Sequence, residues 1–274
     1  MKSLYETMTY SFLTKLTNAS NNVDIEQLTD MGLSPEQADR ISRLPHAYLL
    51  KLCSFQNIID ITIDEELLSI AIERGSKQQR RFGDIPDMNI TNTLLSNLAT
   101  HASDPDEYRF LFQNLNLSPK FIPILASYSL LDILAVVKTG IIWYEITANS
   151  LKLEMALSQV EEAQLETELL RTLIKRDASF PMINALTGMG KAVFIDMRKA
   201  MGVPVTKGGP PRRLTDEEHE ALYYAWNETE GEPLPKRCLA VSKAIDDIAL
   251  RHIWPYLSKM IKNEIPQFER VTTW

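Results

Sequence analysis

An internal similarity constrains the fold of this chain more than any other feature of its sequence. The segment Met31-Gly-Leu-Ser-Pro35 recurs further along the chain as Leu115-Asn-Leu-Ser-Pro119. At the same offset, downstream apolar positions correspond without gaps: Leu49, Leu52, Ile58 and Leu67 align with Ile133, Val136, Ile142 and Leu151. The same order of apolar segments over about 60 residues indicates two diverged copies of one unit.

Each copy is predicted to contain three helices, a short strand and a last helix. Ser34 is a good N-cap for a helix that begins at Pro35, and Gln37 can complete a capping box. The alternating, β-branched segments Ile58–Ile63 and Ile141–Thr147 predict one strand per copy. Since a lone short strand cannot satisfy its backbone, we expect the two strands to pair or to pack around a pseudo-twofold axis. The chain would then hold its own internal dimer.

A long helix is predicted after the second copy, from about Asn149 to Lys175. We interpret it as a connector; a partner-binding coiled coil remains open, although its apolar stripe keeps no strict heptad. The expected fold is mainly α, with two tandem helical units, this connector and a C-terminal helix-turn-helix domain. The predicted segments are 1–75, 88–158 and 159–274, with a polar linker near 74–86.

Charge is distributed unevenly along the chain. The net charge is −7, which argues against a protein that coats DNA non-specifically. Between Lys191 and Arg213, however, six basic residues stand against one acidic residue, Asp196. This basic island in an acidic protein is the strongest indication of a polyanionic partner.

The basic island overlaps a predicted pair of helices. Phe180–Thr187 and Lys191–Met201 read as two helices joined by a glycine-containing turn, as in a helix-turn-helix motif. Such a motif places its second helix in the major groove of DNA. Val193, Met197 and Met201 are expected to face the core. The residues expected on the other faces, and predicted to bind DNA, are Lys191, Ile195, Arg198 and Lys199.

The proline- and glycine-rich run after this helix cannot be regular helix and carries Lys207, Arg212 and Arg213. Basic arms beside a recognition helix contact the DNA backbone or minor groove, so we add these three residues to the predicted DNA-binding set. A solvated basic loop is the alternative. Beyond it, Thr215 and Glu218 form a capping box for a helix through Trp226, and a final helix is expected over Arg237–Trp254.

These features resemble the flagellar master-activator family, FlhD and FlhC, with its relatives on integrative and conjugative elements. The Leu33-Ser-Pro35 helix start, the helix around Leu44–Leu52 and the strand after it resemble FlhD, and the pattern occurs twice. The region Ala178–Trp226 resembles FlhC. One departure is clear: FlhC-type proteins carry a four-cysteine zinc site, and this chain has only Cys53 and Cys238.

The resemblance implies a transcriptional activator that binds double-stranded DNA and recruits RNA polymerase. FlhD-like and FlhC-like chains form hetero-oligomers, so a homodimer or a complex with a related regulator is expected. A rival interpretation is a helical protein–protein adaptor or regulatory subunit that binds no DNA. RNA binding is a third, but no aromatic-rich sheet motif supports it.

Other classes of protein find little support in the sequence. The two cysteines and the scattered histidines lack metal-ligand spacing, so no metal or other cofactor is expected. Gly188-Met-Gly-Lys191 lacks the remaining residues of a phosphate loop, and no nucleophile elbow occurs, so we expect no enzyme. No signal peptide is evident, and the apolar stretch Phe121–Tyr144 is interrupted by polar residues, which indicates core rather than membrane span. A cytoplasmic protein is expected.

Overall fold

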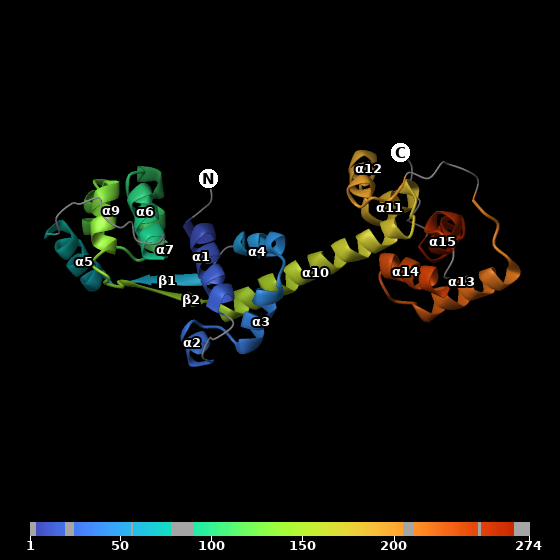
Figure 1. The fold of residues 1–274 in the computed structure, drawn as a ribbon, viewed down its shortest axis with the longest axis horizontal. Helices are drawn as coiled ribbons and strands as arrows, with labels where there is room; N and C mark the ends of the chain where they lie inside the picture. The colour runs from blue at the N-terminus through green and yellow to red at the C-terminus, as the bar shows by residue number, and fades with distance from the viewer. Residues whose placement is uncertain are drawn as a thin grey trace. The chain divides into compact units, whose positions relative to one another are not determined.

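The chain is mainly helical, as predicted, with one two-stranded sheet among the residues described (Figure 1). The computed structural model describes residues 4–19, 25–55, 57–77, 90–204, 211–245 and 248–265. The chain divides into two compact units, Met1–Glu161 and Glu162–Trp274. Both predicted repeats fall in the first unit.

The first unit begins with the first predicted copy, which has four helices before its strand rather than the predicted three, because the short second helix was not predicted. The elements of this copy are α1 (Leu4–Ala19), α2 (Ile25–Asp30), α3 (Pro35–Arg43), α4 (His46–Cys53), β1 (Ile59–Ile63) and α5 (Glu65–Lys77). The predicted capping box starts α3: the Ser34 hydroxyl accepts from the Gln37 backbone N–H at 3.1 Å, and the Gln37 side chain accepts from the Ser34 N–H at 3.1 Å. The helix ends before Pro45, because proline disfavours helical geometry in the preceding residue.

The second predicted copy follows the same order with a more broken central region. Its elements are α6 (Ile90–Ala102), α7 (Tyr108–Asn114), α8 (Ile122–Ala126), α9 (Leu130–Val137), β2 (Tyr144–Ala148) and the start of α10 (Ser150–Lys175); short 3₁₀ turns occupy Pro105–Glu107 and Pro119–Phe121. Ser118-Pro119 therefore starts a 3₁₀ turn rather than a long α-helix. A second proline, Pro123, follows in the first turn of α8.

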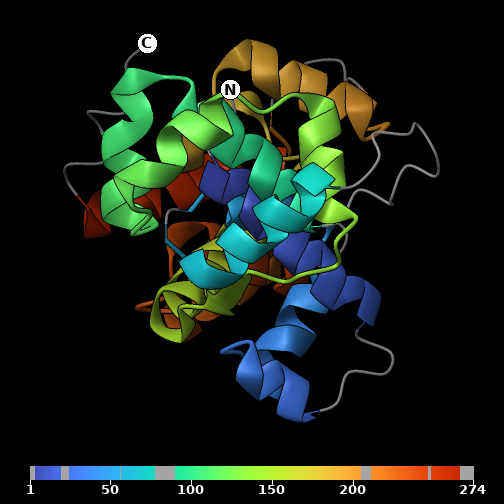
Figure 2. The same cartoon turned by 90° about the vertical axis from the view of Figure 1, so that its left-hand side faces the viewer.

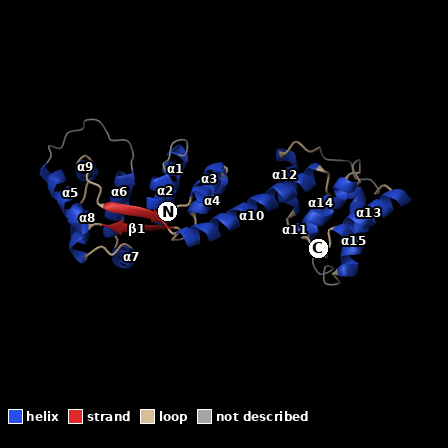
Figure 3. Ribbon diagram, turned by 90° about the horizontal axis from the view of Figure 1, so that it is seen from below, coloured by secondary structure: helices blue, strands red, loops and turns tan. Residues whose placement is uncertain are grey.

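The two predicted strands pair with each other. β1 and β2 run antiparallel, with Ile61 opposite Ile146 at the centre of the ribbon (Figure 3). The pairing that the sequence predicted is therefore confirmed. β2 begins at Tyr144 rather than Ile141, although the Trp143 carbonyl still accepts a hydrogen bond from the Asp64 N–H at 2.8 Å.

One hydrophobic core joins both copies in the first unit. Phe12 and Leu52 from the first copy are buried in the same cluster as Phe121 and Ile133 from the second. Across the copies, α5 packs on α9, and these helices lie side by side in Figures 1 and 2. Much of the apolar stretch Phe121–Tyr144 belongs to this core, as predicted, although Leu130 and Ile142 are exposed.

The second unit has its own core, formed around the end of α10. Its remaining helices are α11 (Phe180–Thr187), α12 (Lys191–Ala200), α13 (Asp216–Glu228), α14 (Leu234–Ala244) and α15 (Leu250–Glu264). Leu173, Trp226 and Leu257 are fully buried in this cluster. The predicted Thr215–Glu218 capping box is present at the start of α13.

The single final helix predicted over Arg237–Trp254 is wrong. The chain leaves the helical path at Ile245, and α15 starts anew at Leu250. The first N–H groups of α15 bond to the turn after α10: Leu250 N–H donates to the Arg176 carbonyl at 3.0 Å, and Arg251 N–H donates to the Asp177 carbonyl at 3.2 Å. These tertiary hydrogen bonds fix the break, and no local sequence signal encodes them.

Candidate nucleic-acid interface

The two helices predicted to form the DNA-reading segment are α11 and α12, joined by residues 188–190. Ser179 caps α11, and Gly188 ends it in the left-handed conformation at φ +71°. The Asn184 side chain donates to the Met189 carbonyl at 3.1 Å and so holds the connection in place. Phe180 and Phe194 pack ring against ring, with 5.8 Å between centroids, and thereby join the two helices.

Helix α12 is attached to the rest of the unit by a narrow stripe. Only Phe194 and Arg198, one turn apart, are buried along it. Lys191, Ile195 and Lys199 follow one another at four-residue spacing and are all exposed, so they form one continuous outer face. Ile195 exposes 47% of its surface, which is a large fraction for a bulky apolar side chain.

The prediction that Arg198 binds DNA is wrong. Only 7% of the residue is exposed, and its guanidinium donates to Asp177 Oδ1 at 2.8 Å and to the Pro204 carbonyl at 2.6 Å. Asp177 Oδ2 also pairs with Arg251 at 2.9 Å. Arg198 therefore ties α12 to the turn after α10 and does not reach the surface.

The expectation that Val193 faces the core is also wrong, because 57% of the residue is exposed. Phe194 takes the inward position instead, and Met197 and Met201 are half-buried beside the core, as expected. The periodicity alone could not decide between Val193 and Phe194. The exposed Val193 adds a second apolar side chain to the outer surface of α12.

The basic run after α12 is described from Pro211 onward, so the predicted contribution of Lys207 lies outside the described residues. Arg213 is exposed. Arg212 is half-exposed; its guanidinium pairs with Glu218, and its backbone N–H donates to His252 Nδ1 at 2.9 Å. The hydrogen bond from the Thr215 N–H, and then the Arg212 guanidinium, hold the pKa of Glu218 below its usual value.

The structure adds Arg251 and His252, which the sequence reasoning did not select. Both stand in the first turn of α15, and the His252 ring contacts the Arg212 backbone. Burial, followed by the charge of Arg251, lowers the pKa of His252, so its ring is neutral at pH 7. Arg251 remains one-third exposed beside Arg212. Only the tertiary contact between the 211–214 segment and α15 brings these cations together.

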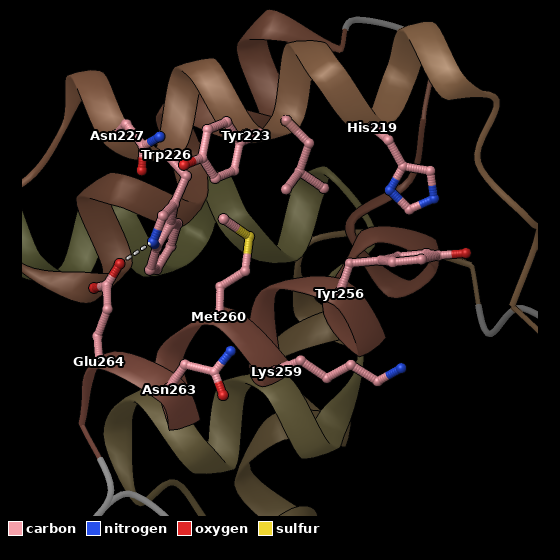
Figure 4. A pocket seen from close by; sticks show the side chains of 10 residues that line it. His219, Tyr223, Trp226, Asn227, Tyr256, Lys259, Met260, Asn263 and Glu264 are labelled. Atoms are coloured by element: carbon pink, nitrogen blue, oxygen red, sulfur yellow. Dashed lines mark hydrogen bonds between the residues drawn. The ribbon is translucent and has the colours of Figure 1, made fainter.

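A groove of about 470 Å³ runs between α13 and α15 (Figure 4). Tyr223 from α13 and Tyr256 and Met260 from α15 line it; Met260 points toward α13, and the Tyr256 ring lies beneath His219. His219 packs edge-on against Tyr256 at 4.6 Å between ring centroids. An aromatic groove between two helices suits a helical or extended peptide.

Trp226 closes the inner end of this groove but belongs to the core, because none of its surface is exposed. Its ring stacks on the Arg237 guanidinium at 3.6 Å, and its N–H donates to Glu264 Oε1 at 2.5 Å. Arg237 also donates to Glu264 Oε2 at 2.6 Å and lowers the pKa of that carboxyl. Since its ring is fully buried, Trp226 is not available to stack on a nucleic-acid base.

Neither a metal site nor a single membrane-spanning helix occurs in the described ranges. No cluster of His, Cys, Asp and Glu side chains there could hold a metal ion. No single helix in those ranges is long and apolar enough to cross a membrane. The bent pair Pro119–Ala126 and Leu130–Val137 together resembles a membrane span in length and composition only.

Comparisons with known proteins place the chain in a family without assigning it an activity. No curated protein and no solved structure matches it. One family model matches residues 91–263, from the first helix of the second copy to the last turns of α15. This match covers more than half of the chain, which therefore belongs to the family described as a protein of unknown function, DUF2857.

Proposed function

We propose that the protein is a sequence-specific, double-stranded DNA-binding transcriptional activator of the cytoplasm. The observation that carries the proposal is the outer face of α12, where Lys191, Ile195 and Lys199 are exposed in one stripe. The narrow attachment of this helix through Phe194 and Arg198 leaves most of its circumference free. A helix that enters the major groove needs that freedom.

Each exposed side chain of α12 has a chemical role in this proposal. Lys191 stands at the helix N-terminus, where it can reach a phosphate or a guanine edge. Ile195 and Val193 present methyl groups that suit the thymine methyl group, and this contact explains why two large apolar side chains face solvent. Lys199, two turns along, reaches the flanking backbone.

The segment after α12 supplies further contacts with the DNA backbone. Arg213 is exposed. The Arg212 backbone N–H donates to the ring of His252, the residue that follows the partly exposed Arg251. Contacts with the DNA backbone fix register without reading sequence. The resemblance to the flagellar master activators extends the proposal to recruitment of RNA polymerase, and to action as a homodimer or a hetero-oligomer with a related regulator. The proposal includes no catalytic activity and no cofactor.

Salt dependence of DNA binding tests this proposal. If Lys191, Lys199, Lys207, Arg212 and Arg213 each neutralise one phosphate, log affinity falls with log salt at a slope of about −4.5. A selection from a random duplex library followed by fluorescence anisotropy between 50 and 200 mM salt, roughly the range over which such contacts are sensitive, gives both sequence preference and slope.

A double substitution distinguishes α12 from general charge effects. Lys191→Ala with Lys199→Ala is expected to weaken binding and to reduce the slope by about 2. The matched control is Lys236→Ala with Lys243→Ala, which removes two exposed lysines of α14 and should leave the slope nearly unchanged. Absence of duplex binding at low salt, or equal effects of the two double variants, contradicts the proposal.

The groove between α13 and α15 favours a second function, a protein–protein adaptor. Its aromatic lining and the exposed Tyr223 and Tyr224 suit an apolar peptide, and Val193 and Ile195 would suit a protein partner as well as thymine. Under this alternative, Tyr223→Ala abolishes partner binding, whereas removal of Lys191 and Lys199 has little effect. Titration with duplex DNA then shows no binding at any salt concentration.

A further inference from the structure

The pairing of β1 with β2 has an internal symmetry. The offset that carries Ser34 onto Ser118 also carries Ile61 onto Glu145 and Thr62 onto Ile146, and these last four residues form two adjacent cross-strand pairs. The same offset carries both bounds of α4, His46 and Cys53, onto those of α9. Pairing of this kind is what a pseudo-twofold axis between two equivalent halves requires.

A backbone feature repeats at the same interval. Gly32 has φ +72° just before the Ser34 helix start, and Asn116 has φ +51° just before Ser118. Left-handed residues are uncommon outside glycine, so their recurrence at one spacing is a third and independent sign of equivalence. Residues 1–77 and 90–161 are called the first half and the second half below.

The last helix of each half contacts the Ser-Pro helix start of the other half. At one junction Glu65, at the start of α5, accepts from the Ser118 hydroxyl at 2.9 Å and pairs with Lys120 at 3.3 Å. At the other junction Gln37 donates to the Ser150 carbonyl, at the start of α10, at 3.2 Å. Reciprocal contacts of this kind also occur in dimers whose subunits swap an element.

Two glycines allow the halves to approach closely. A Cβ on Gly32 would lie 2.6 Å from the Ala148 carbonyl oxygen, and a Cβ on Gly75 would lie 2.9 Å from the Val136 backbone nitrogen. Both contacts join a residue of the first half to backbone of the second half. At these two positions the main chains of the two halves therefore lie so close that a side chain would clash with the backbone of the second half.

The region that the family model matches covers all but the first residue of the second half and none of the first half. The matched region begins at residue 91 and so contains β2, α9 and α10 but neither β1 nor α5. A single short strand cannot satisfy its backbone, and α9 would lose the helix that covers it. We propose that the first half acts as a covalently linked partner of the second half. It is a copy of the same helix–strand–helix unit, and it occupies the surface on which the family region binds a second such unit.

The cross-half contacts of Arg40 offer a test with a matched control. Arg40, on α3, pairs with Glu161 at 2.8 Å and Glu154 at 2.6 Å, both in the second half. Arg43, on the same helix, is exposed and pairs only locally, with Asp39 at 3.0 Å, among the ion pairs found. Arg40→Met removes a contact between the halves, whereas Arg43→Met removes an arginine of the same helix without touching the interface.

The experiment cuts the folded full-length chain between its halves. A protease recognition sequence is inserted among residues 78–89, the purified protein is cleaved, and the pieces are followed by size-exclusion chromatography with light scattering. The two pieces are expected to stay together one to one at micromolar concentration. In the cut protein, Arg40→Met should raise the dissociation constant of the pieces about tenfold or more, because charge-assisted contacts are lost, and Arg43→Met should leave it within about twofold.

A second pair of variants tests the main-chain contact. Gly75→Val should separate the cut pieces, whereas Ser76→Val adds the same side chain at the next, exposed position of α5 and should not. Separation of the unsubstituted pieces, equal effects within either pair of variants, or homodimers of the second piece that exclude the first would each overturn the proposal.

Discussion

Glu264 shows how a single carboxylate can link the stability of the second unit to pH. The hydrogen bonds from Arg237, and that from Trp226, favour its ionised form and lower its pKa from the ordinary 4.5. A group whose pKa is lower in the folded than in the unfolded state stabilises the fold above the unfolded pKa, and the effect is lost as pH falls through the folded pKa. We therefore expect this contribution in full at pH 7 and its loss below about pH 4.5.

Glu264→Gln removes that contribution. The variant should unfold at lower urea than the parent at pH 7, and the difference should shrink as the pH is lowered towards 4. Urea midpoints followed by tryptophan fluorescence at several pH values measure both effects. Glu228→Gln, at an exposed position of α13, is the control; a difference for Glu264→Gln that stays constant with pH would contradict the assignment.

Arg198 and Lys199 show that residue type alone could not predict which basic side chains of α12 are exposed. The sequence marks Arg198 and Lys199 equally as basic residues of one helix, yet Arg198 is buried on Asp177 and Lys199 is exposed. The difference depends on the turn after α10, where Asp177 adopts φ +60° and offers one carboxylate oxygen to each of two arginines. A partner that lies in an earlier element of the chain leaves no trace in helical periodicity.

Among the elements, Gly188 fixes where α11 ends and therefore where α12 begins. Its φ of +71° is left-handed, and an added Cβ would meet no atom within 4 Å. The cost of Gly188→Ala is thus expected to come from the backbone alone, about 1 kcal/mol. Gly188→Asn should cost less, because asparagine adopts this conformation more readily. Urea unfolding of the three proteins measures this order; an alanine variant as stable as the parent would show that the turn is not strained.

Element boundaries were predicted well where the signal is local and poorly where it is tertiary. The capping boxes at Ser34 and Thr215, and the bounds of α11, follow from side chains within a few residues of each boundary. The start of β2 and the break between α14 and α15 do not, because partners distant in sequence decide them. The outer face of α12 was predicted in part. Lys191, Ile195 and Lys199 are exposed as expected, whereas Arg198, expected to be exposed, is buried, and Val193, expected to be buried, is exposed.

At the scale of the whole molecule, the acidic excess and the basic island belong to different units. Met1–Glu161 contains 20 acidic and 13 basic residues, whereas Glu162–Trp274 contains 16 of each. The pairing of two strands far apart in the sequence was predictable, since each needed a partner and the repeat supplied one. The hydrophobic core is separated into two clusters, and one continuous helix, α10, carries residues of both.

These two clusters share no residue, and this separation leads to a prediction for unfolding. Leu52 in the first cluster and Leu257 in the second are both fully buried, so Leu52→Ala and Leu257→Ala should each cost about 2–5 kcal/mol. Each cavity is expected to destabilise its own unit, so calorimetry should show two transitions, of which each variant lowers one. The double variant should lower both by the amounts seen singly, because distant sites are additive. If both single variants lowered one common transition instead, α10 would have to transmit the loss of packing between the units, and the chain would unfold as one cooperative body.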